Sequence, residues 1–391
     1  MINDNYKEDI KKQLIEELSD SIMLDEKEIF NVIDNKIEEI EQREKPFKLK
    51  EKLVLRKSVY DSLKKYDILT ELLDDKNINE IMINSYDEIF IDEKGKYKRW
   101  SKKFESKEQL ENIIQQIVGK INRIVNVSNP IVDARLADGS RVHIVLPPIA
   151  IKGATVTIRK FPERITMKKL IEYGSIDSDT ANFLRKLVQA GYNIFISGGT
   201  GSGKTTFLNA LSEFIPKTDR VITIEDSAEL NISQVENLVS LETRDKNVEG
   251  EGEISMQMLI KAALRMNPDR IVVGEVRGKE ALDMLQAMNT GHDGSLSTGH
   301  ANSSYDMLSR LETMVLMAEN LPLLAIRQQI SSSIDILVHL VKLKNKRRVV
   351  YEITELCELD GENYRTNKLY SFNGDSLTKC GSLENTRKLN L

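Results

Sequence analysis

One segment of this 391-residue chain has the composition and order of a phosphate-binding loop. The run Gly-Gly-Thr-Gly-Ser-Gly-Lys-Thr at 198–205 satisfies the pattern G-x-x-x-x-G-K-[ST] and follows the apolar stretch 193–197. Glycines let successive backbone N–H groups point at phosphate oxygens, and the start of the following helix adds partial positive charge. Lys204 would reach the β- and γ-phosphates, and the Thr205 hydroxyl would bind Mg²⁺. These residues predict a site for ATP and Mg²⁺.

The strand before this loop and the helix-forming residues after it are the context that the motif requires. A glycine-rich turn with a chance lysine is the alternative, and this context argues against it. We expect the loop and the first helical turn to contact the nucleotide. The contacting residues would be Gly199, Thr200, Gly201, Ser202, Gly203, Lys204, Thr205 and Thr206.

Two acidic segments are candidates to complete the site. An apolar strand at 221–224 runs into Glu225 and Asp226, and another at 271–274 runs into Glu275. Because the carboxyl ends of parallel strands share one edge of a sheet, these acids would lie beside the loop. We expect Glu275 to polarise the attacking water as a general base and to contact Mg²⁺ through water. Glu225 would share the first role, and the sequence leaves open which of the two is the principal base.

Two of the four histidines, His292 and His300, lie in the glycine-rich segment 291–302, which follows the strand of Glu275. A lone histidine is most often structural. Two in such a segment favour a nucleotide sensor, because an imidazole changes its charge near neutral pH. We expect His300 to contact the nucleotide.

Taken together, these motifs resemble the secretion-superfamily ATPases, which drive type II and type IV secretion and type IV pilus assembly. Further motifs resemble the CpaF branch, which powers tight-adherence (Flp-type) pili. They are Val132-Asp-Ala-Arg-Leu136, Gly139-Ser-Arg-Val-His143, Thr157-Ile-Arg-Lys-Phe161, Leu241-Glu-Thr-Arg244 and Ala262-Ala-Leu-Arg-Met266. The resemblance covers residues 67–358. The four-cysteine zinc insert of many type II secretion members is absent, since the chain has only Cys357 and Cys380.

The resemblance implies a homo-hexameric ring, in which a small domain is flexibly joined to a RecA-like motor domain and ATP binds between them. By position, Glu275 matches the catalytic glutamate of these proteins, and Glu225 and Asp226 match their acidic box. The work of the ring would be passed to an inner-membrane platform protein.

Three arginines of the small domain, Arg135, Arg141 and Arg159, match family arginines that reach the phosphates. The residues around them agree, because a charge in an apolar strand needs a partner such as a phosphate. An internal salt bridge is an equally good explanation for each single arginine. Arg244, Arg265 and Arg277 are weaker candidates, for contacts between subunits.

The pattern along the chain predicts five segments. Apolar residues three or four apart, such as Ile10, Leu14, Leu18 and Ile22, predict a helical bundle over 1–66. Alternating strands with an Asp-Gly hairpin signal predict a small α+β (PAS-like) domain over 67–160. The remaining segments are a linker at 161–176, an α/β domain at 177–359, which the resemblance implies to be a RecA-like P-loop motor, and a poorly ordered tail at 360–391.

The composition of the chain indicates which partners the protein binds and where in the cell it works. The net charge of −5 argues against a nucleic-acid binder, which usually carries a basic face. No apolar run approaches the roughly 20 residues that span a bilayer, and the first residues do not resemble a signal peptide. We expect a cytoplasmic protein that meets the inner face of the membrane through a partner, without direct contact to nucleic acid.

The expected function is ATP hydrolysis that powers assembly of a tight-adherence pilus or related secretion. The alternatives are a conjugative type IV secretion ATPase that moves DNA or protein, a retraction motor, and a non-catalytic nucleotide-gated scaffold. Intact Lys204, Thr205 and Glu275 argue against the scaffold. The chemistry of the site cannot separate the other three.

Overall fold

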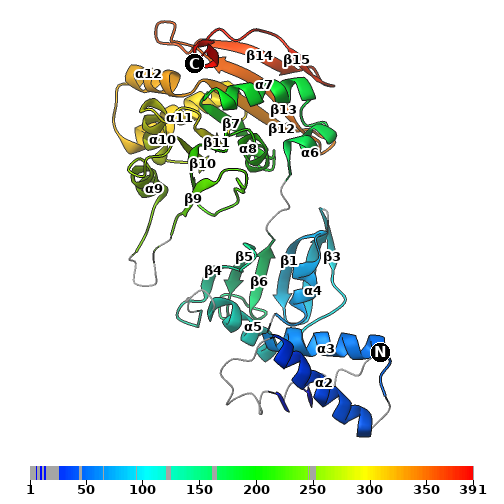
Figure 1. Cartoon of the computed structure of the whole chain (residues 1–391). Coiled ribbons are helices and arrows are strands. Elements are labelled where there is room, and N and C mark those ends of the chain that lie inside the picture. The colour runs from blue at the N-terminus through cyan, green and yellow to red at the C-terminus, as the bar shows by residue number, and fades with distance from the viewer. Residues whose placement is uncertain are drawn as a thin grey trace. The chain divides into compact units, whose positions relative to one another are not determined.

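The computed structural model divides the chain into two compact units, Met1–Glu163 and Arg164–Leu391, and each is described by itself (Figure 1). The described residues are 26–43, 46–64, 66–93, 95–119, 125–160, 165–244, 246 and 252–390, with Tyr6, Asp9, Ile10, Gln13 and Leu14 near the N-terminus. Among them, no helix is both long enough and apolar enough to cross a membrane.

The N-terminal part of the first unit contains two paired helices, α2 (Glu26–Arg43) and α3 (Leu49–Lys64). Their facing sides bury apolar residues at helical spacing, together with the predicted positions Ile10 and Leu14. Leu18 and Ile22, which continue the predicted stripe, lie outside the described residues.

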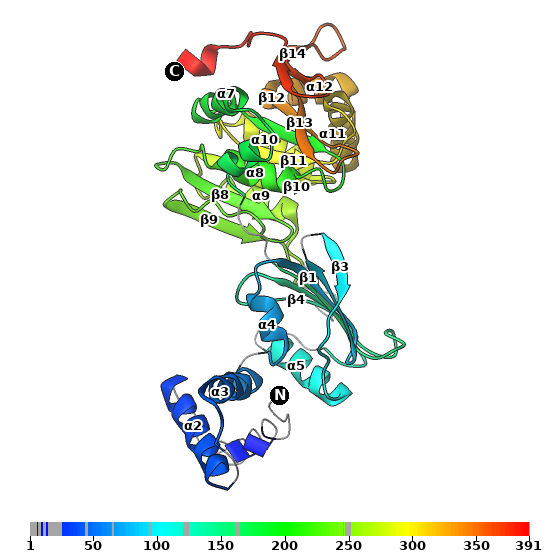
Figure 2. The same cartoon turned by 90° about the vertical axis from the view of Figure 1, so that its right-hand side faces the viewer.

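The rest of the first unit is an antiparallel sheet with helices on one face. Its order is β3-β2-β1-β6-β5-β4. The strands are β1 (Ile78–Ser85), β2 (Glu88–Glu93), β3 (Lys96–Arg99), β4 (Ile131–Arg135), β5 (Arg141–Val145) and β6 (Thr155–Arg159). Figure 2 shows α4 (Leu69–Asp74) and α5 (Lys107–Gly119) along the same side of the sheet. Alternate strand residues, such as Val142 and Ile144, are buried against them, and no helix of the described part of this unit covers the opposite face of the sheet.

The second unit is built on a nine-stranded sheet of order β15-β14-β13-β12-β7-β11-β10-β8-β9. The parallel strands are β7 (Ile194–Gly198), β8 (Arg220–Glu225), β9 (Asn237–Glu242), β10 (Arg270–Val276), β11 (Leu296–Gly299) and β12 (Ile336–Lys342). The antiparallel end consists of β13 (Arg348–Leu356), β14 (Thr366–Phe372) and β15 (Leu377–Lys379). A mostly parallel sheet needs helices on both faces, because its central strands are apolar on both sides.

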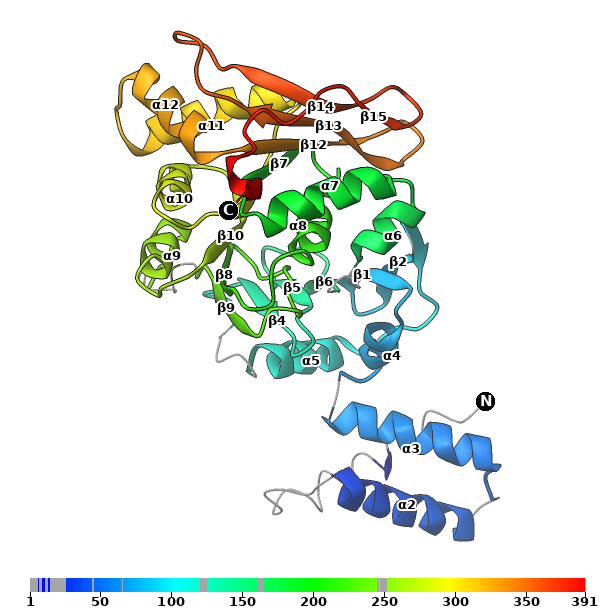
Figure 3. The same cartoon turned by 45° about the horizontal axis from the view of Figure 1, so that its top comes forward.

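Those helices form two layers (Figure 3). The first layer contains α6 (Met167–Glu172), α7 (Ser178–Gln189) and α8 (Lys204–Ser212). The second contains α9 (Met256–Ala263), α10 (Glu280–Asn289), α11 (Ser304–Ala318) and α12 (Leu323–Ser333). Strand β7 shows how the pleat supplies both cores, since Ile194 and Ile196 pack with the first layer and Phe195 packs with the second.

Most of the segment predicted as a linker, 161–176, belongs to the second unit. Met167, Leu170 and Ile176 are buried in its core, and the Thr166 hydroxyl caps α6. Lys168 and Lys169 lie between the buried Met167 and Leu170, as expected for a short amphipathic helix. Residues 161–164 lie outside the described part of the chain.

The tail at 360–391 was predicted to be poorly ordered, and this is wrong for residues 360–390. They form β14, β15 and a short 3-10 helix at Arg387–Asn390. Polar contacts with the rest of the unit hold this segment in place. The Lys388 ammonium donates to Asp293 Oδ1 at 2.7 Å and to Asp335 Oδ2 at 2.8 Å. Such contacts join residues far apart in sequence and leave no periodic pattern to predict them.

We predict that Glu355→Ala loosens the tail. The buried Glu355 carboxylate accepts hydrogen bonds from Asn367 Nδ2 at 2.8 Å, from Glu384 N at 2.9 Å and from Asn385 N at 2.7 Å. Leaving these donors unsatisfied should lower the free energy of unfolding by about 2–4 kcal/mol. Limited trypsin digestion, followed by mass spectrometry, should show faster cleavage after Arg387 and Lys388.

The exposed neighbour Glu358 supplies the control variant, Glu358→Ala, which should be cleaved at the wild-type rate. Equal cleavage of the Glu355 and Glu358 variants would show that the carboxylate does not anchor the tail.

Candidate active site

The predicted phosphate-binding loop joins the buried strand β7 to the start of α8. Gly198 has no room for a side chain, because a Cβ atom there would lie 2.5 Å from the Leu340 carbonyl oxygen and 2.5 Å from Ser202 Oγ. Gly203 precedes the helix with φ of +96°, a left-handed conformation that favours glycine. The loop therefore has the tight, glycine-dependent turn that brings backbone N–H groups toward a bound anion.

Lys204 places its ammonium inside this loop. The residue is only 7% exposed, and Nζ donates to the carbonyl oxygens of Gly198 at 3.2 Å and Gly199 at 3.4 Å. Burial lowers the pKa of Lys204, and the nearby Glu275 carboxylate partly offsets this effect. No carboxylate of the described residues is within ion-pair distance of the ammonium, so an anion such as phosphate would complete its surroundings.

Glu275 lies near the carboxyl end of β10, and its two oxygens differ. Oε2 accepts a hydrogen bond from Arg277 Nη2 at 2.8 Å. Oε1 is buried and has no hydrogen bond from the described residues, although His300 Nε2 lies 2.9 Å away. A carboxylate oxygen of this kind can accept a proton from water or face a hydrated cation.

His300 follows β11 and lies between Lys204 and Glu275. Its Nδ1 is 3.2 Å from Lys204 Nζ. Burial and the neighbouring Lys204 ammonium lower the pKa of His300, which favours the neutral imidazole. His292, the other histidine of this segment, precedes β11 and lies within 3.2 Å of the Ala287 carbonyl oxygen instead. Because β11 separates the two histidines, they lie at opposite ends of this strand, and only His300 lies at the end where the phosphate-binding loop begins.

Glu225 ends β8 beside Glu275, but its carboxylate has other partners. Oε2 accepts hydrogen bonds from the backbone N–H groups of Glu229 at 2.8 Å and Leu230 at 3.0 Å. The side chain is 4% exposed and packs on Gly274, where a Cβ atom would lie 2.9 Å from Glu225 Cγ. Burial raises the pKa of Glu225 to about 7, although the backbone hydrogen bonds act in the opposite direction. This carboxylate shapes the loop that follows β8.

Asp226 is half exposed and lies 3.4 Å from Arg277, measured from Oδ2 to Nη1. The structure therefore brings five predicted or candidate residues together, in the order Lys204, His300, Glu275, Arg277 and Asp226.

The site fits a magnesium ion that is held mainly by substrate phosphates. Within the described ranges, no group of three or more His, Cys, Asp or Glu side chains could hold a metal by itself. Mg²⁺ in nucleotide sites keeps several waters and uses one or two protein ligands. Thr205, in the first turn of α8, and the buried Glu275 Oε1 are the groups that would hold it, the second through water. When bound, the ion would neutralise charge on the phosphates.

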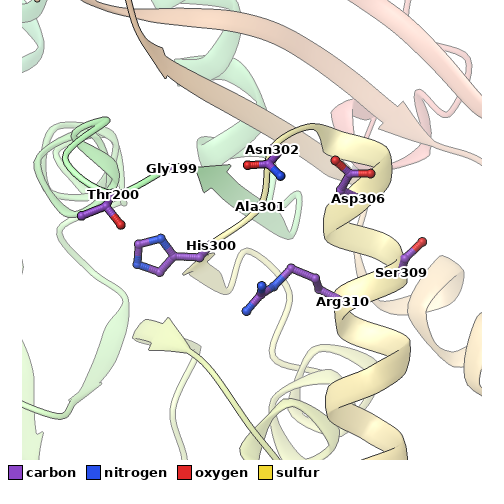
Figure 4. Close-up of a pocket in the computed structure, with 8 residues that line it drawn as sticks. All are labelled: Gly199, Thr200, His300, Ala301, Asn302, Asp306, Ser309 and Arg310. Atoms are coloured by element: carbon purple, nitrogen blue, oxygen red, sulfur yellow. The ribbon is translucent and has the colours of Figure 1, made fainter.

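A pocket of about 470 Å³ opens beside the loop (Figure 4). Its lining consists of Gly199, Thr200, His300, Ala301, Asn302, Asp306, Ser309 and Arg310. Figure 4 shows Arg310 extending from α11 into the pocket on the side of His300.

Three residues of the site were not found from the sequence. Arg310 lines the pocket, Arg348 Nε donates to the Gly201 carbonyl oxygen at 2.9 Å, and His339 Nδ1 lies 2.9 Å from Ser197 Oγ. They come from α11, β13 and β12, and no motif marks them. Only the pairing of β12 with β7 could have indicated His339, since it is the cross-strand neighbour of Ser197.

The three predicted arginines belong to the first unit, where they form a row across three strands. Arg141 is the cross-strand partner of both Arg135 and Arg159. The row continues to Glu80 on β1, which is opposite Arg159. All lie on the face of the sheet that no helix covers, because Val142 and its alternate neighbours face the core. Arginine side chains are well suited to bind phosphate oxygens, so this row is a candidate anion site.

Strand order, helix layers and a glycine loop around a buried lysine define a RecA-like P-loop ATPase. Residues 62–387 match the family described as Type II/IV secretion system protein, so this chain belongs to that family and is an ATPase. The family match confirms the predicted secretion superfamily and the α/β fold class.

Individual relatives agree with this family. A putative conjugal transfer protein of Mycobacterium tuberculosis is 33% identical over 301 residues, which are 75% of this chain and 85% of that protein. The type IV secretion system protein PtlH of Bordetella pertussis is 33% identical over 288 residues, which are 67% of this chain and 85% of that protein. The solved structure of the pilus retraction motor PilT with bound ADP shares the fold, with a TM-score of 0.54 at 20% identity, over 84% of this chain and 86% of that one.

We predict that Glu225→Gln removes part of the pH dependence of stability. The folded pKa of about 7 exceeds the ordinary value of 4.5, so the folded state binds more protons between these values. The stabilisation from the protonated acid is present below about pH 4.5 and lost as pH rises through about 7. Relative to the neutral glutamine, wild type should lose on the order of 2–3 kcal/mol of unfolding free energy.

The measurement is denaturant unfolding of both proteins at pH 5, 6, 7 and 8. Glu236→Gln, an exposed change on the same segment, should leave the wild-type pH curve unaltered. Parallel curves for wild type and Glu225→Gln would mean that this carboxyl titrates normally in the folded protein.

Proposed function

We propose that this ATPase works as a homo-hexameric ring in the cytoplasm and powers assembly of a tight-adherence (Flp-type) pilus through an inner-membrane platform protein. The observation that supports a working motor best is the contact series from Lys204 through His300 to Glu275, which joins the phosphate-binding lysine to a candidate base. The pilus branch is supported by the five sequence motifs between residues 132 and 266.

In the proposed reaction, Lys204 binds the β- and γ-phosphates and Glu275 Oε1 accepts a proton from the attacking water. Glu275 is the better candidate for principal base, because Glu225 already accepts two backbone hydrogen bonds. His300 would sense the γ-phosphate, since it contacts both the lysine and the base. Loss of the γ-phosphate would leave Lys204 without its anion, and such a change can drive a domain movement.

The arginine row has a proposed role in the same reaction. Arg135, Arg141 and Arg159 would bind phosphate oxygens of the nucleotide, in the same copy or a neighbouring one, and stabilise charge in the transition state. The support is their register, which aligns three guanidinium groups on one face of the sheet.

A second candidate function is that of a type IV secretion ATPase that moves DNA or protein. The names of two relatives favour it, since one is a putative conjugal transfer protein and the other a type IV secretion system protein. Because the net charge of this chain is −5, DNA in such a system would be contacted by other components.

We predict that Glu275→Gln abolishes ATP hydrolysis and keeps ATP binding. The amide cannot accept the proton of the attacking water, and general-base catalysis contributes about 10²–10⁴-fold to a rate. Lys204→Ala should lose binding itself. Phosphate release and binding of a fluorescent ATP analogue should be measured with Mg²⁺ on size-fractionated protein at several concentrations, with the exposed Glu319→Gln as control. Wild type that binds ATP but never turns it over, in any assembly state, would contradict the motor.

The branch is tested by complementation of a source strain that lacks this chain. The pilus proposal expects loss of surface pili, which wild type restores and Glu275→Gln does not. Normal pili together with lost conjugation or protein secretion would support the second candidate instead.

We predict that Arg141→Ala, at the centre of the row, lowers the hydrolysis rate by roughly 10³-fold or more. Lysine should rescue poorly, because it lacks the planar fork of arginine. The melting temperature should stay close to that of wild type, because Arg141 lies on the face of the sheet opposite its core. Arg99→Ala on β3 changes an exposed arginine outside the row and should keep wild-type activity. A lower melting temperature with unchanged activity in Arg141→Ala would indicate a purely structural arginine.

A further inference from the structure

Arg277 connects two acidic residues that lie at the ends of neighbouring strands. One nitrogen, Nη2, donates to Glu275 Oε2 at 2.8 Å, and the other, Nη1, lies 3.4 Å from Asp226 Oδ2. The hydrogen bond to Glu275 raises the pKa of Arg277, so the guanidinium stays charged. A planar fork can hold two carboxylates in a defined geometry, which a flexible ammonium cannot do.

The backbone that carries Arg277 is also fixed. The N–H groups of Arg277 and Gly278 both donate to Glu280 Oε1, at 2.6 Å and 2.8 Å, at the start of α10. Arg277 is therefore held at its backbone by Glu280 and at its side chain by two carboxylates. Arg277 in turn holds Oε2 of Glu275. The other oxygen, Oε1, is buried and accepts no hydrogen bond from the described residues.

This arrangement contributes little to stability. The Arg277 side chain is 63% exposed, and exposed ion pairs have small effects on folding. Its effect on geometry is larger, because Glu275 is only 19% exposed and, without Arg277, would lose the one hydrogen bond that its carboxylate accepts from the described residues. A catalytic carboxylate that can rotate loses its alignment with the attacking water.

The geometry points to Arg277 as a positioning residue for hydrolysis, anchored by Asp226. It holds Oε2 of Glu275 so that Oε1 faces the reacting water. Asp226 then acts on hydrolysis through Arg277. This inference rests on the proposed role of Glu275 as the base.

The test compares steady-state kinetics and ATP affinity in Arg277→Ala, Arg277→Lys and Asp226→Asn. Arg277→Ala should lower kcat roughly 10–100-fold with ATP affinity within about twofold of wild type. Arg277→Lys should recover part of this loss, and Asp226→Asn should have a smaller effect. The double variant Arg277→Ala/Asp226→Asn should resemble Arg277→Ala alone, because residues that act in series are not additive. Lys279→Ala changes an exposed side chain two residues from Arg277, so it is the control and should behave as wild type.

Two further comparisons distinguish a failure of the proposal for Arg277 from a failure of the proposed role of Glu275. In the Glu275→Gln background, Arg277→Ala should change nothing, since no base remains to be positioned. If Glu275→Gln is itself fully active, the proposed function of Glu275 fails and the fault does not lie with Arg277.

Unchanged kcat in Arg277→Ala, or a fall in ATP affinity equal to the fall in kcat, would overturn the positioning role. Mixed rings of Arg277→Ala and Glu275→Gln subunits give the last check. They should stay as slow as their components, whereas restored activity would show that Arg277 serves the site of a neighbouring subunit.

Discussion

A positive charge buried at the carboxyl edge of a parallel sheet is the constraint on which the site depends. The Lys204 ammonium has exchanged water for two loop carbonyl oxygens and an imidazole, which do not neutralise its charge. Burial disfavours the charged form, and the nearby Glu275 carboxylate favours it. The lysine is thus prepared for an anion before one arrives, since its own solvent has already been removed.

The order of the strands places the side chains of the site next to one another along the carboxyl edge of the sheet. The loop follows β7, His300 follows β11, Glu275 lies near the end of β10, and Glu225 ends β8. Because these strands are neighbours in the order β7-β11-β10-β8, the histidine lies between the lysine and the first glutamate. The contacts from Lys204 to His300, from His300 to Glu275 and from Arg277 to Asp226 follow from which strands are adjacent, and not from distance along the chain.

The two glutamates show how neighbouring positions acquire different chemistry. Both are acids at the ends of adjacent apolar strands. Glu225 is directed into backbone N–H groups of the next loop, and Gly274 leaves the space that its side chain needs. Glu275 lies one residue beyond that glycine and keeps one oxygen free of hydrogen bonds from the described residues. A difference in packing therefore separates a structural acid from a candidate base.

The sequence by itself determined the features whose chemistry is local. The phosphate-binding loop needs glycines, a lysine and a hydroxyl within eight residues, so its motif is readable without a fold. The alternation of strands and helices predicted an α/β domain, the resemblance of the motifs implied its RecA-like class, and acids after apolar runs predicted the edge at which they meet. Only the tertiary structure decided which glutamate carboxylate accepts backbone hydrogen bonds. It also decided that Arg277 links Glu275 to Asp226 and that three arginines share one row. It also ordered the tail, through Glu355 and Lys388. The physical reason is that burial, hydrogen-bond partners and strand register depend on residues far away in the chain, and no local pattern records them.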